Sequence, residues 1–355
     1  MKSIYGLLLL VSLQLSGSEL VPVSPVRGEA VPLLRSDWKE LVEQRKISKP
    51  KKKTLDQNLH FPLSVKLVWK GGTPPYVLHL SGGSDRRTIN GLPSGELSLV
   101  NLLSGTEYEW RITDAAGNRA ESRFHTQAGP RLIELPDKEH SPVNLRDLGG
   151  RTSKYGGVVR QGIIYRGSEL NYDRKFSEKN RLFMVQELKI RTELDLRYEK
   201  QIKSEKQTFS TLGRTVVWRH YAVNAYKSFT PEQNELFRNA IRVFASKDAY
   251  PVFIHCNGGV DRTGEIAFLL NAVAGVSDAE LLEDYEFSSL CIFPRPRTIP
   301  YFQRWLKGIA SYSSAEKPYS EQVEQYLLAI GVTREEIAAI RANMLQTEPE
   351  ESRKE

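Results

Sequence analysis

The chain has 355 residues, 26% of them charged and 40% hydrophobic, and a formal net charge of +7. This length accommodates two ordinary domains, and the composition is that of a globular protein. Two cysteines, Cys256 and Cys291, are too few for a disulfide scaffold. The positive charge suits anionic substrates or surfaces. The basic residues are scattered, however, and lack the interleaved aromatic residues of a nucleic-acid-binding module, so we expect no nucleic-acid partner.

Residues 1–18 have the pattern of a secretory signal peptide. Lys2 precedes an apolar run from Ile4 to Leu15, and three small residues follow at positions 16–18. The apolar run is shorter than the ~20 residues that a membrane-spanning helix needs. We therefore expect no integral membrane span and predict a periplasmic or secreted protein. An uncleaved N-terminal anchor is the alternative interpretation of the same pattern.

Residues 19–57 predict a short helix and a basic linker. Between residues 36 and 46, Trp38, Leu41 and Val42 fall on one face of an amphipathic helix. The Lys- and Arg-rich stretch at 45–53 is typical of a solvated linker, and anchoring at an acidic surface is the alternative.

Residues 58–128 change in character to short alternating segments, such as 64–69 and 108–112, separated by glycine pairs. The set resembles a fibronectin type III or similar immunoglobulin-like sandwich, a small all-β domain of two sheets. We expect its alternating aromatic residues to form the core. Spacing, docking and surface binding are the roles open to such a domain.

Residues 131–347 alternate strand-like and helical segments, which predicts a layered α/β domain. The strand-like segments are 158–165, 194–196, 216–220 and 252–255, and the helical segments are 183–188, 231–245, 263–274 and 320–330. A polar tail, 348–355, closes the chain. The predicted architecture is therefore multidomain, an all-β sandwich followed by an α/β domain.

The segment 255–264, His-Cys-Asn-Gly-Gly-Val-Asp-Arg-Thr-Gly, carries the chemistry. It joins a predicted buried strand to a predicted helix, so its backbone N–H groups converge at a helix N-terminus and form an anion site. This field, together with the charge of Arg262, favours the thiolate form of Cys256. Arg262 can hold two phosphoryl oxygens with its planar guanidinium. Thr263 can hydrogen-bond the sulfur. The spacing therefore predicts a thiolate that cleaves phosphate esters.

The rest of the loop supports the same chemistry. Asn257, Gly258, Gly259 and Val260 would supply the amides, and the two glycines can adopt positive φ and bring no Cβ near the ligand. His255 is expected to shape the loop and the surroundings of the thiol through hydrogen bonding, and a satisfied core histidine is the alternative. A buried structural cysteine beside a helix-capping turn is the alternative for the whole segment.

Cys291 allows a redox interpretation. A disulfide between Cys291 and Cys256 would switch the thiolate off reversibly and protect it from over-oxidation. A small buried side chain, between Leu290 and Ile292 in the sequence, is the simpler interpretation of Cys291.

From about Pro142 to Leu345 the chain resembles the bacterial cysteine-dependent tyrosine phosphatases. The likeness is to the branch of secreted tyrosine/dual-specificity and phosphoinositide phosphatases whose loop ends in Asp-Arg-Thr-Gly. The shared motifs lie at 144–150, 164–168, 193–197, 284–285 and 326–332. Some relatives place a lysine at the position of Val260, a feature associated with phosphoinositide substrates. Its absence here weakens the lipid-phosphate interpretation without excluding it.

The reaction also needs a proton donor for the leaving oxygen. The resemblance points to Asp261, because members with an aspartate in the loop use it, although the neighbouring Arg262 favours its ionised form. Asp195 and Asp147 are the alternatives, and both lie in motifs whose carboxylates often serve the scaffold. In the predicted mechanism the Cys256 thiolate attacks phosphorus, a phosphocysteine forms, and water hydrolyses it.

These inferences predict an active phosphomonoester hydrolase that needs no metal or cofactor. The resemblance makes phosphotyrosine in a protein the default substrate, with a phosphoinositide or inositol phosphate as the alternative. A catalytically silent phosphate-binding module would not need the nucleophile, and rhodanese-like sulfurtransferase loops have fewer residues between Cys and Arg. Additional phosphates could be bound by Arg151, Arg166, Arg295 and Arg297, or these could be ordinary surface arginines. The oligomeric state is left open.

Overall fold

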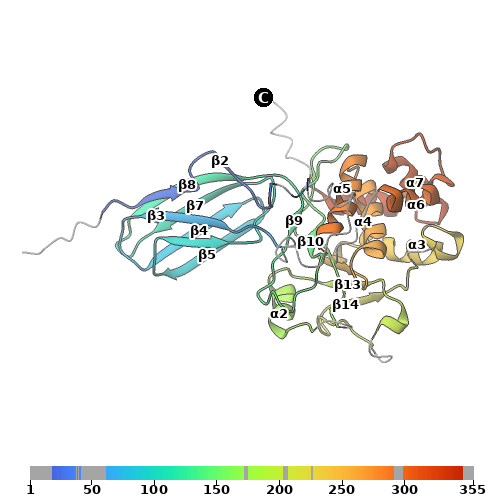
Figure 1. The fold of residues 1–355 in the computed structure, drawn as a ribbon, viewed down its shortest axis with the longest axis horizontal. Helices are drawn as coiled ribbons and strands as arrows, with labels where there is room; N and C mark the ends of the chain where they lie inside the picture. The colour runs from blue at the N-terminus through green and yellow to red at the C-terminus, as the bar shows by residue number, and fades with distance from the viewer. Residues whose placement is uncertain are drawn as a thin grey trace, which may run out of the picture. The chain divides into compact units, whose positions relative to one another are not determined.

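The computed structural model describes residues 18–36, 38, 40, 61–171, 175–202, 207–224, 227–291 and 299–346. These residues form a β unit and a larger α/β unit (Figure 1). The β unit comprises the described residues up to Val31, Lys66–Leu99 and Glu107–His125, and the α/β unit comprises the rest. None of the helices in the described part of the chain combines the length and the apolar character needed to cross a membrane. The signal-peptide prediction falls on residues 1–17, which lie outside the described residues, and on Ser18.

The β unit consists of two sheets. One has the order β1 (Val21–Ser24), β3 (Val65–Lys70) and β6 (Glu96–Leu99), and the other has the order β2 (Glu29–Val31), β8 (Arg119–Thr126), β7 (Glu107–Thr113), β4 (Tyr76–Gly82) and β5 (Asp85–Leu92). The Trp69 ring lies 5.4 Å from that of Tyr76 and 6.5 Å from that of Trp110, so apolar side chains of the two sheets meet. The expected strands are therefore present. The likeness to a fibronectin or immunoglobulin domain stays a prediction.

Strands β1 and β2 lie within residues 19–57, for which the sequence analysis predicted a helix and a linker. Val21 pairs with Lys70, and Pro22 pairs with Trp69. Prolines at positions 22 and 25 hid the strand pattern, because proline cannot donate to a sheet ladder and is confined to edge strands. β1 is such an edge strand. Most of the predicted helix and the basic linker lie outside the described residues.

The α/β unit is built on a six-stranded sheet. Its order is β14 (Val217–His220), β13 (Thr192–Asp195), β15 (Val252–His255), β12 (Ile164–Gly167), β10 (Arg146–Asp147) and β9 (Arg131–Leu132). The first four strands are parallel and the last two antiparallel. A two-stranded sheet of β11 (Val158–Val159) and β16 (Leu345–Gln346) lies apart from it. The predicted strand 158–165 is thus two strands, since Gly162 with φ +82° turns the chain between them.

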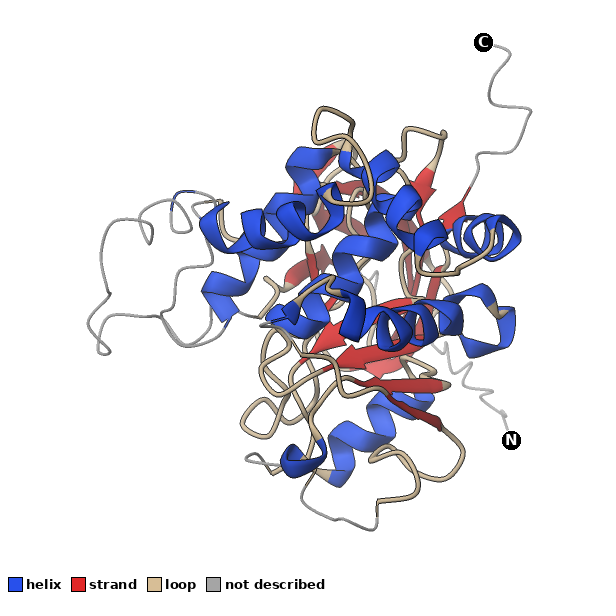
Figure 2. Cartoon of the chain, turned by 90° about the vertical axis from the view of Figure 1, so that its right-hand side faces the viewer, coloured by secondary structure: helices blue, strands red, loops and turns tan. Residues whose placement is uncertain are grey.

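Helices cover both faces of the six-stranded sheet (Figure 2). The helices are α2 (Glu178–Gln186), η2 (Glu199–Gln201), η4 (Pro231–Gln233), α3 (Asn234–Arg242), η5 (Val243–Ala245), η6 (Lys247–Ala249), α4 (Asp261–Val273), α5 (Asp278–Cys291), α6 (Ile299–Ala310), α7 (Tyr319–Ala329) and α8 (Arg334–Met344). Ile254 of β15 packs in one apolar cluster with α3, α4, α7 and α8. The adjacent Phe253 packs in a second cluster with α2. Successive residues of a strand point to opposite faces, so the sheet lies between two helical layers.

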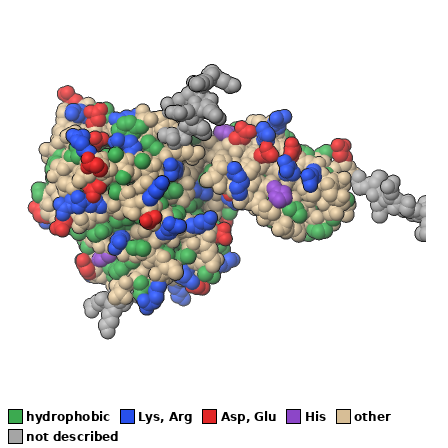
Figure 3. All heavy atoms as spheres, turned by 180° about the vertical axis from the view of Figure 1, so that it is seen from behind, with side chains coloured by type: hydrophobic (Ala, Val, Ile, Leu, Met, Phe, Trp, Pro, Cys, Tyr) green, Lys and Arg blue, Asp and Glu red, His purple; other side chains and the backbone are tan. Residues whose placement is uncertain are grey.

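The central helix of the α/β unit is α4. All its residues from Arg262 to Val273 are buried, as expected of a helix surrounded by other elements. Lys and Arg side chains are spread among acidic and apolar ones over the face shown in Figure 3, in keeping with the scattered basic residues of the sequence.

Candidate active site

The loop 256–260 connects the end of β15 to the start of α4. Val260 is the N-cap residue of α4, and its side chain makes no capping hydrogen bond. The backbone N–H groups of residues 257–260 donate no hydrogen bond to any residue that the structure describes. Unsatisfied N–H groups at a helix N-terminus attract anions, and the helix dipole adds to this attraction. These N–H groups are therefore available to an anion, and the anion site itself stays a prediction.

Gly259 fixes the shape of this loop. Its φ is +67°, and a Cβ built on it would lie 2.2 Å from the carbonyl oxygen of Gly167. Its own carbonyl oxygen accepts hydrogen bonds from Asn144 Nδ2 and Arg166 Nη2, each at 2.8 Å. Only glycine fits this position. Gly258 is not among the residues with positive φ, so the conformational freedom expected of both glycines is used at one of them.

Cys256 is 3% exposed and follows β15 directly. Burial alone would raise the pKa of its thiol. The charge of Arg262 and hydrogen bonds from the side chain and backbone of Thr263 outweigh burial and the opposing charge of Asp261, so the pKa lies below its ordinary value. The Thr263 hydroxyl is buried without a hydrogen-bond partner among the described residues, which leaves its proton available to the sulfur. The thiolate form of Cys256 is therefore more favoured than that of an ordinary cysteine.

Arg262, the second residue of α4, reaches back over the carboxyl end of β13. Its Nη1 donates to the carbonyl oxygen of Leu196 at 3.0 Å and to Gln201 Oε1 at 2.9 Å. The Tyr198 ring lies 4.8 Å from its guanidinium carbon, within the range of a cation–π contact. These contacts hold the guanidinium in a defined orientation beside the loop. The sequence analysis missed Tyr198 and Gln201, because nothing in the local pattern links η2 to α4.

A buried cluster of charged residues contacts the loop through Arg166, which donates to the carbonyl oxygens of Gly259 and Val260. Asp284 of α5 pairs with Arg146 Nε at 2.9 Å, Arg166 Nη1 at 2.5 Å and Arg151 Nη2 at 3.4 Å. Burial would raise the pKa of Asp284, but these three guanidinium groups hold it well below its usual range. Burial, with the charge of Arg146, lowers the pKa of Arg166 to about 10.

This cluster rules out one of the two interpretations of Arg151 and Arg166 that the sequence left open. Both are buried, at 7% and 0% exposure, and pair with Asp284, so neither is an ordinary surface arginine. Arg295 and Arg297 lie outside the described residues.

Residues 139–346, more than half of the chain, match the model of a family described as "Tyrosine phosphatase family". The chain belongs to this family. It therefore contains a cysteine-based phosphatase domain, and Cys256 and Arg262 lie within the matched region.

Two solved structures are similar over part of the chain. One is the core catalytic domain of the PP-IP phosphatase SIW14 from S. cerevisiae in complex with citrate, with 22% identity, 44% of this chain and 90% of that chain covered, and a TM-score of 0.31. The other is a Siw14 catalytic core, with 20% identity, 47% and 96% covered, and a TM-score of 0.32. The search of curated proteins gave no match.

The three aspartates considered as proton donors have different surroundings in this phosphatase. Asp261, the first residue of α4, is half-buried, and its Oδ1 accepts a hydrogen bond from the Tyr285 hydroxyl at 3.0 Å. Asp147 is 2% exposed and accepts from Arg131 Nη1 at 2.7 Å and from two backbone N–H groups. Asp195 is fully buried and its two oxygens face the guanidinium of Arg197. Only Asp261 belongs to the loop–helix junction that follows Cys256.

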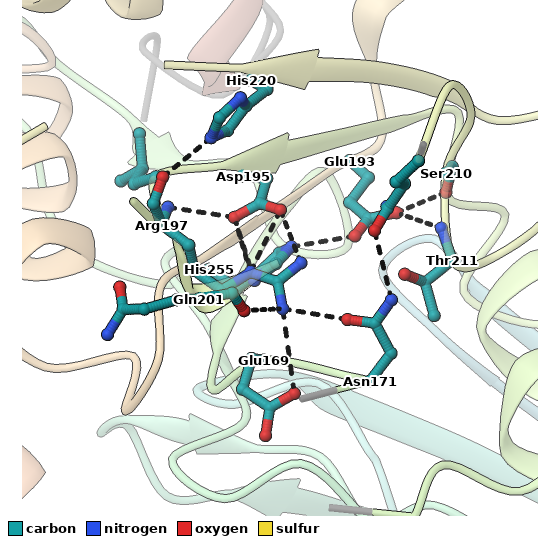
Figure 4. Close-up of polar contacts among 12 residues, drawn as sticks. Glu169, Asn171, Glu193, Asp195, Arg197, Gln201, Ser210, Thr211, His220 and His255 are labelled. Atoms are coloured by element: carbon teal, nitrogen blue, oxygen red, sulfur yellow. Dashed lines mark hydrogen bonds and ion pairs between the residues drawn. The ribbon is translucent and has the colours of Figure 1, made fainter. Parts of the chain in front are cut away.

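His255 belongs to a buried network with strand β13 (Figure 4). Its Nε2 lies 2.8 Å from Glu193 Oε1, and its Nδ1 lies 3.8 Å from Asp195 Oδ1. Burial would lower the pKa of His255, but the charge of Asp195 and the hydrogen bond to Glu193 raise it. For Asp195, burial is outweighed by the charge of His255 and the hydrogen bonds from Arg197, so its pKa falls to about 2.

The hydrogen bonds of this network fix His255 to the sheet rather than to the thiol. Glu193, Asp195 and His255 are also close enough together to share a cation. The Arg197 guanidinium, however, already lies 2.7 Å from Asp195 Oδ2, so the cluster is an internal ion-pair network. Sequence reasoning missed the role of Glu193, although its position in a central strand, buried on both faces, was a usable signal.

Proposed function

We propose that this chain hydrolyses phosphomonoesters through a phosphocysteine intermediate and that its substrate is phosphotyrosine in a protein. The observation that carries the proposal is the placement of Cys256, whose thiol pKa is lowered by Arg262 and Thr263, at an uncapped helix N-terminus. A nucleophile whose thiolate form is favoured and that lies at a helix N-terminus is what attack on a phosphate ester requires.

The proposed reaction proceeds in two steps. The Cys256 sulfur attacks phosphorus in line with the leaving oxygen, and the S–P bond forms as the P–O bond breaks. Asp261 donates its proton to the leaving phenol oxygen. Arg262 and the loop amides stabilise the charge on the three equatorial oxygens. In the second step Asp261 accepts a proton from water, which attacks phosphorus and releases the thiolate, aided by the Thr263 hydroxyl.

Asp261 is proposed as the proton donor because of where the three aspartates lie. Asp195 and Asp147 are almost fully buried and paired with arginines, so they lack access to a leaving group. Asp261 is half-buried and follows the loop that would hold the phosphate.

A phosphoinositide or inositol phosphate is the alternative substrate. Recognition of several phosphates needs accessible cations beside the reacting one. Arg151 and Arg166 are engaged with Asp284 in the interior, and Val260 stands where some relatives have lysine. These two observations favour a substrate with a single phosphate. A catalytically silent phosphate-binding module is the remaining alternative, and a periplasmic or secreted location stays part of the proposal.

Phosphate release tests the proposal. The reduced chain lacking residues 1–18 would be assayed with a phosphotyrosine peptide, a panel of soluble inositol phosphates, and phosphoinositides in vesicles. Cys256→Ser is the test variant and Cys291→Ser its matched control. We expect release from the peptide that Cys256→Ser abolishes and Cys291→Ser retains. Faster release from the inositol compounds would overturn the substrate assignment, and no release from any substrate by folded, reduced protein would leave the phosphate-binding module.

A further inference from the structure

Glu265 is a buried carboxyl group that the proposed reaction does not use. It is the fifth residue of α4 and is fully buried. Its Oε1 accepts a hydrogen bond from the Ser228 hydroxyl, and its Oε2 is buried without a hydrogen-bond partner among the described residues. An ionised carboxylate with an unpartnered buried oxygen is costly. The surroundings of Glu265 therefore favour its neutral, protonated form.

The position of Glu265 connects it to the active site. It lies four residues after Asp261 on the same helix, and side chains at this spacing are neighbours. Burial raises the pKa of Glu265 to about 8; the hydrogen bond from Ser228 and the charge of Arg262 oppose this effect, and the charges of Asp261 and Cys256 add to it. An interaction between charges is mutual. Ionisation of Glu265 would therefore act on Cys256 and Asp261 in turn.

The elements around α4 supply few groups that could compensate such a charge. The titratable and charged groups on the packed elements include Tyr326 of α7, Asp284 and Tyr285 of α5, Arg166 of β12, His255 of β15 and Arg341 of α8. Arg166 is already paired with Asp284, and Arg341 donates to the carbonyl oxygen of Val273 at the other end of α4. The buried residues of α3 are the apolar Phe237, Ala240 and Ile241.

We propose that Glu265 is a positioning residue that the phosphatase reaction requires in its protonated form, because its proton keeps a further negative charge away from the Cys256 thiolate and from the incoming phosphate group. This inference rests on the proposed function. The ionised form would repel an anionic substrate and favour the protonated thiol. Activity should therefore decline as the pH rises through the titration of Glu265.

The pH dependence of kcat/KM tests the role of the proton. For the wild type we expect about a tenfold fall for each pH unit above the titration of one essential group, beginning near pH 8, where Glu265 ionises. Glu265→Gln carries a permanently neutral side chain of nearly the same shape, so this decline should be absent in it. Ser228→Ala removes a hydrogen bond that lowers the pKa of Glu265, so its decline should begin at a higher pH.

A second measurement does not depend on phosphatase activity. Alkylation of Cys256 would be followed by peptide mass spectrometry with iodoacetate, which is anionic, and with iodoacetamide, which is neutral. In the wild type the ratio of the iodoacetate rate to the iodoacetamide rate should fall as Glu265 ionises. In Glu265→Gln this ratio should stay constant. A ratio independent of pH in the wild type would overturn the inference, even if the enzyme hydrolyses phosphotyrosine. A falling ratio without any hydrolysis would show that Glu265 acts on the reactivity of Cys256, and it would refute the proposed function.

If Glu265→Gln does not fold, Ser228→Ala decides the question in both assays. If kcat/KM and the ratio of the alkylation rates both begin to fall at a higher pH in Ser228→Ala than in the wild type, the role of Glu265 is supported. A decline that stays at its wild-type position, or moves to lower pH, contradicts it.

Discussion

Replacement of Asp284 by asparagine would remove a carboxylate that faces three buried arginines. Asp284 contacts Arg146, Arg166 and Arg151 in the interior of the α/β unit, where the side chains of Arg146 and Arg166 are fully buried. Asp284→Asn keeps the volume of the side chain but removes the negative charge with which these guanidinium groups pair. Breaking a buried ion pair by removing one partner costs about 3–5 kcal/mol.

That cost translates into a measurable fall in thermal stability. For a domain of this size a change of 1 kcal/mol shifts Tm by roughly 2–4 °C, so we expect the unfolding transition of the α/β unit to fall by about 10 °C at pH 7. Because the pKa of Asp284 is held well below its usual range, its stabilising effect is fully present above its unfolded value of about 3.9. The effect is lost as the pH falls through the folded value.

Differential scanning calorimetry would measure the shift, with Glu235→Gln as the control. Glu235 pairs with Arg238 at 3.9 Å on the surface of α3, with 76% of its side chain exposed, so water screens this pair and little change is expected. Cys256 alkylation at neutral pH should also slow in Asp284→Asn, because Arg166 holds the carbonyl oxygens of Gly259 and Val260. A Tm of Asp284→Asn within the range of the control would refute the reasoning.

Three further predictions concern the loop and the network beside it. Gly259→Ala should abolish activity and destabilise the protein far more than Gly117→Ala, because a Cβ at position 259 would meet a backbone oxygen at 2.2 Å. A Cβ at Gly117, whose φ is +88°, would meet nothing within 4 Å, so Gly117→Ala should lower the free energy of unfolding in urea by only about 1–2 kcal/mol. Thr263→Val removes the hydroxyl that lowers the pKa of Cys256, so the midpoint of iodoacetamide alkylation against pH should move upward, and an unchanged midpoint would contradict the assignment. Because the pKa of His255 is raised in the folded protein, protonation of His255 stabilises the fold. This stabilisation is fully present below the unfolded pKa of about 6.5 and is lost as the pH rises through the folded pKa. The difference in free energy of unfolding between the wild type and His255→Gln should therefore narrow as the pH rises through the folded pKa of His255. A difference that widened over this pH range would contradict the prediction.

The placement of the nucleophile could be predicted from sequence because it depends on local signals. A buried strand, a loop with glycines and a helix follow one another directly, and β15 has the predicted limits, Val252–His255. The spacing of Cys256 and Arg262 within that segment requires no knowledge of distant contacts. The α/β layering could be predicted for the same reason, since the alternation of strands and helices is itself local.

The contacts that tune the site could not be predicted, because they join segments far apart in the chain. Gln201 meets Arg262 across 61 positions, and Asp284 meets Arg146 across 138. Glu265 is misleading in sequence, since an acidic residue in the first turns of a helix is typical of an exposed position. Its burial follows only from the central place of α4 among the other helices.

The central claim is that Cys256 forms a covalent bond to phosphorus during turnover. The most direct test is rapid acid quenching of the reduced enzyme with a phosphotyrosine substrate, followed by mass spectrometry of the peptide that contains Cys256. We predict a phosphorylated Cys256 in the wild type that is present during turnover and disappears once substrate is exhausted. Phosphate release with no phosphorylated Cys256 at any quench time, or equal release by Cys256→Ser, would contradict the account.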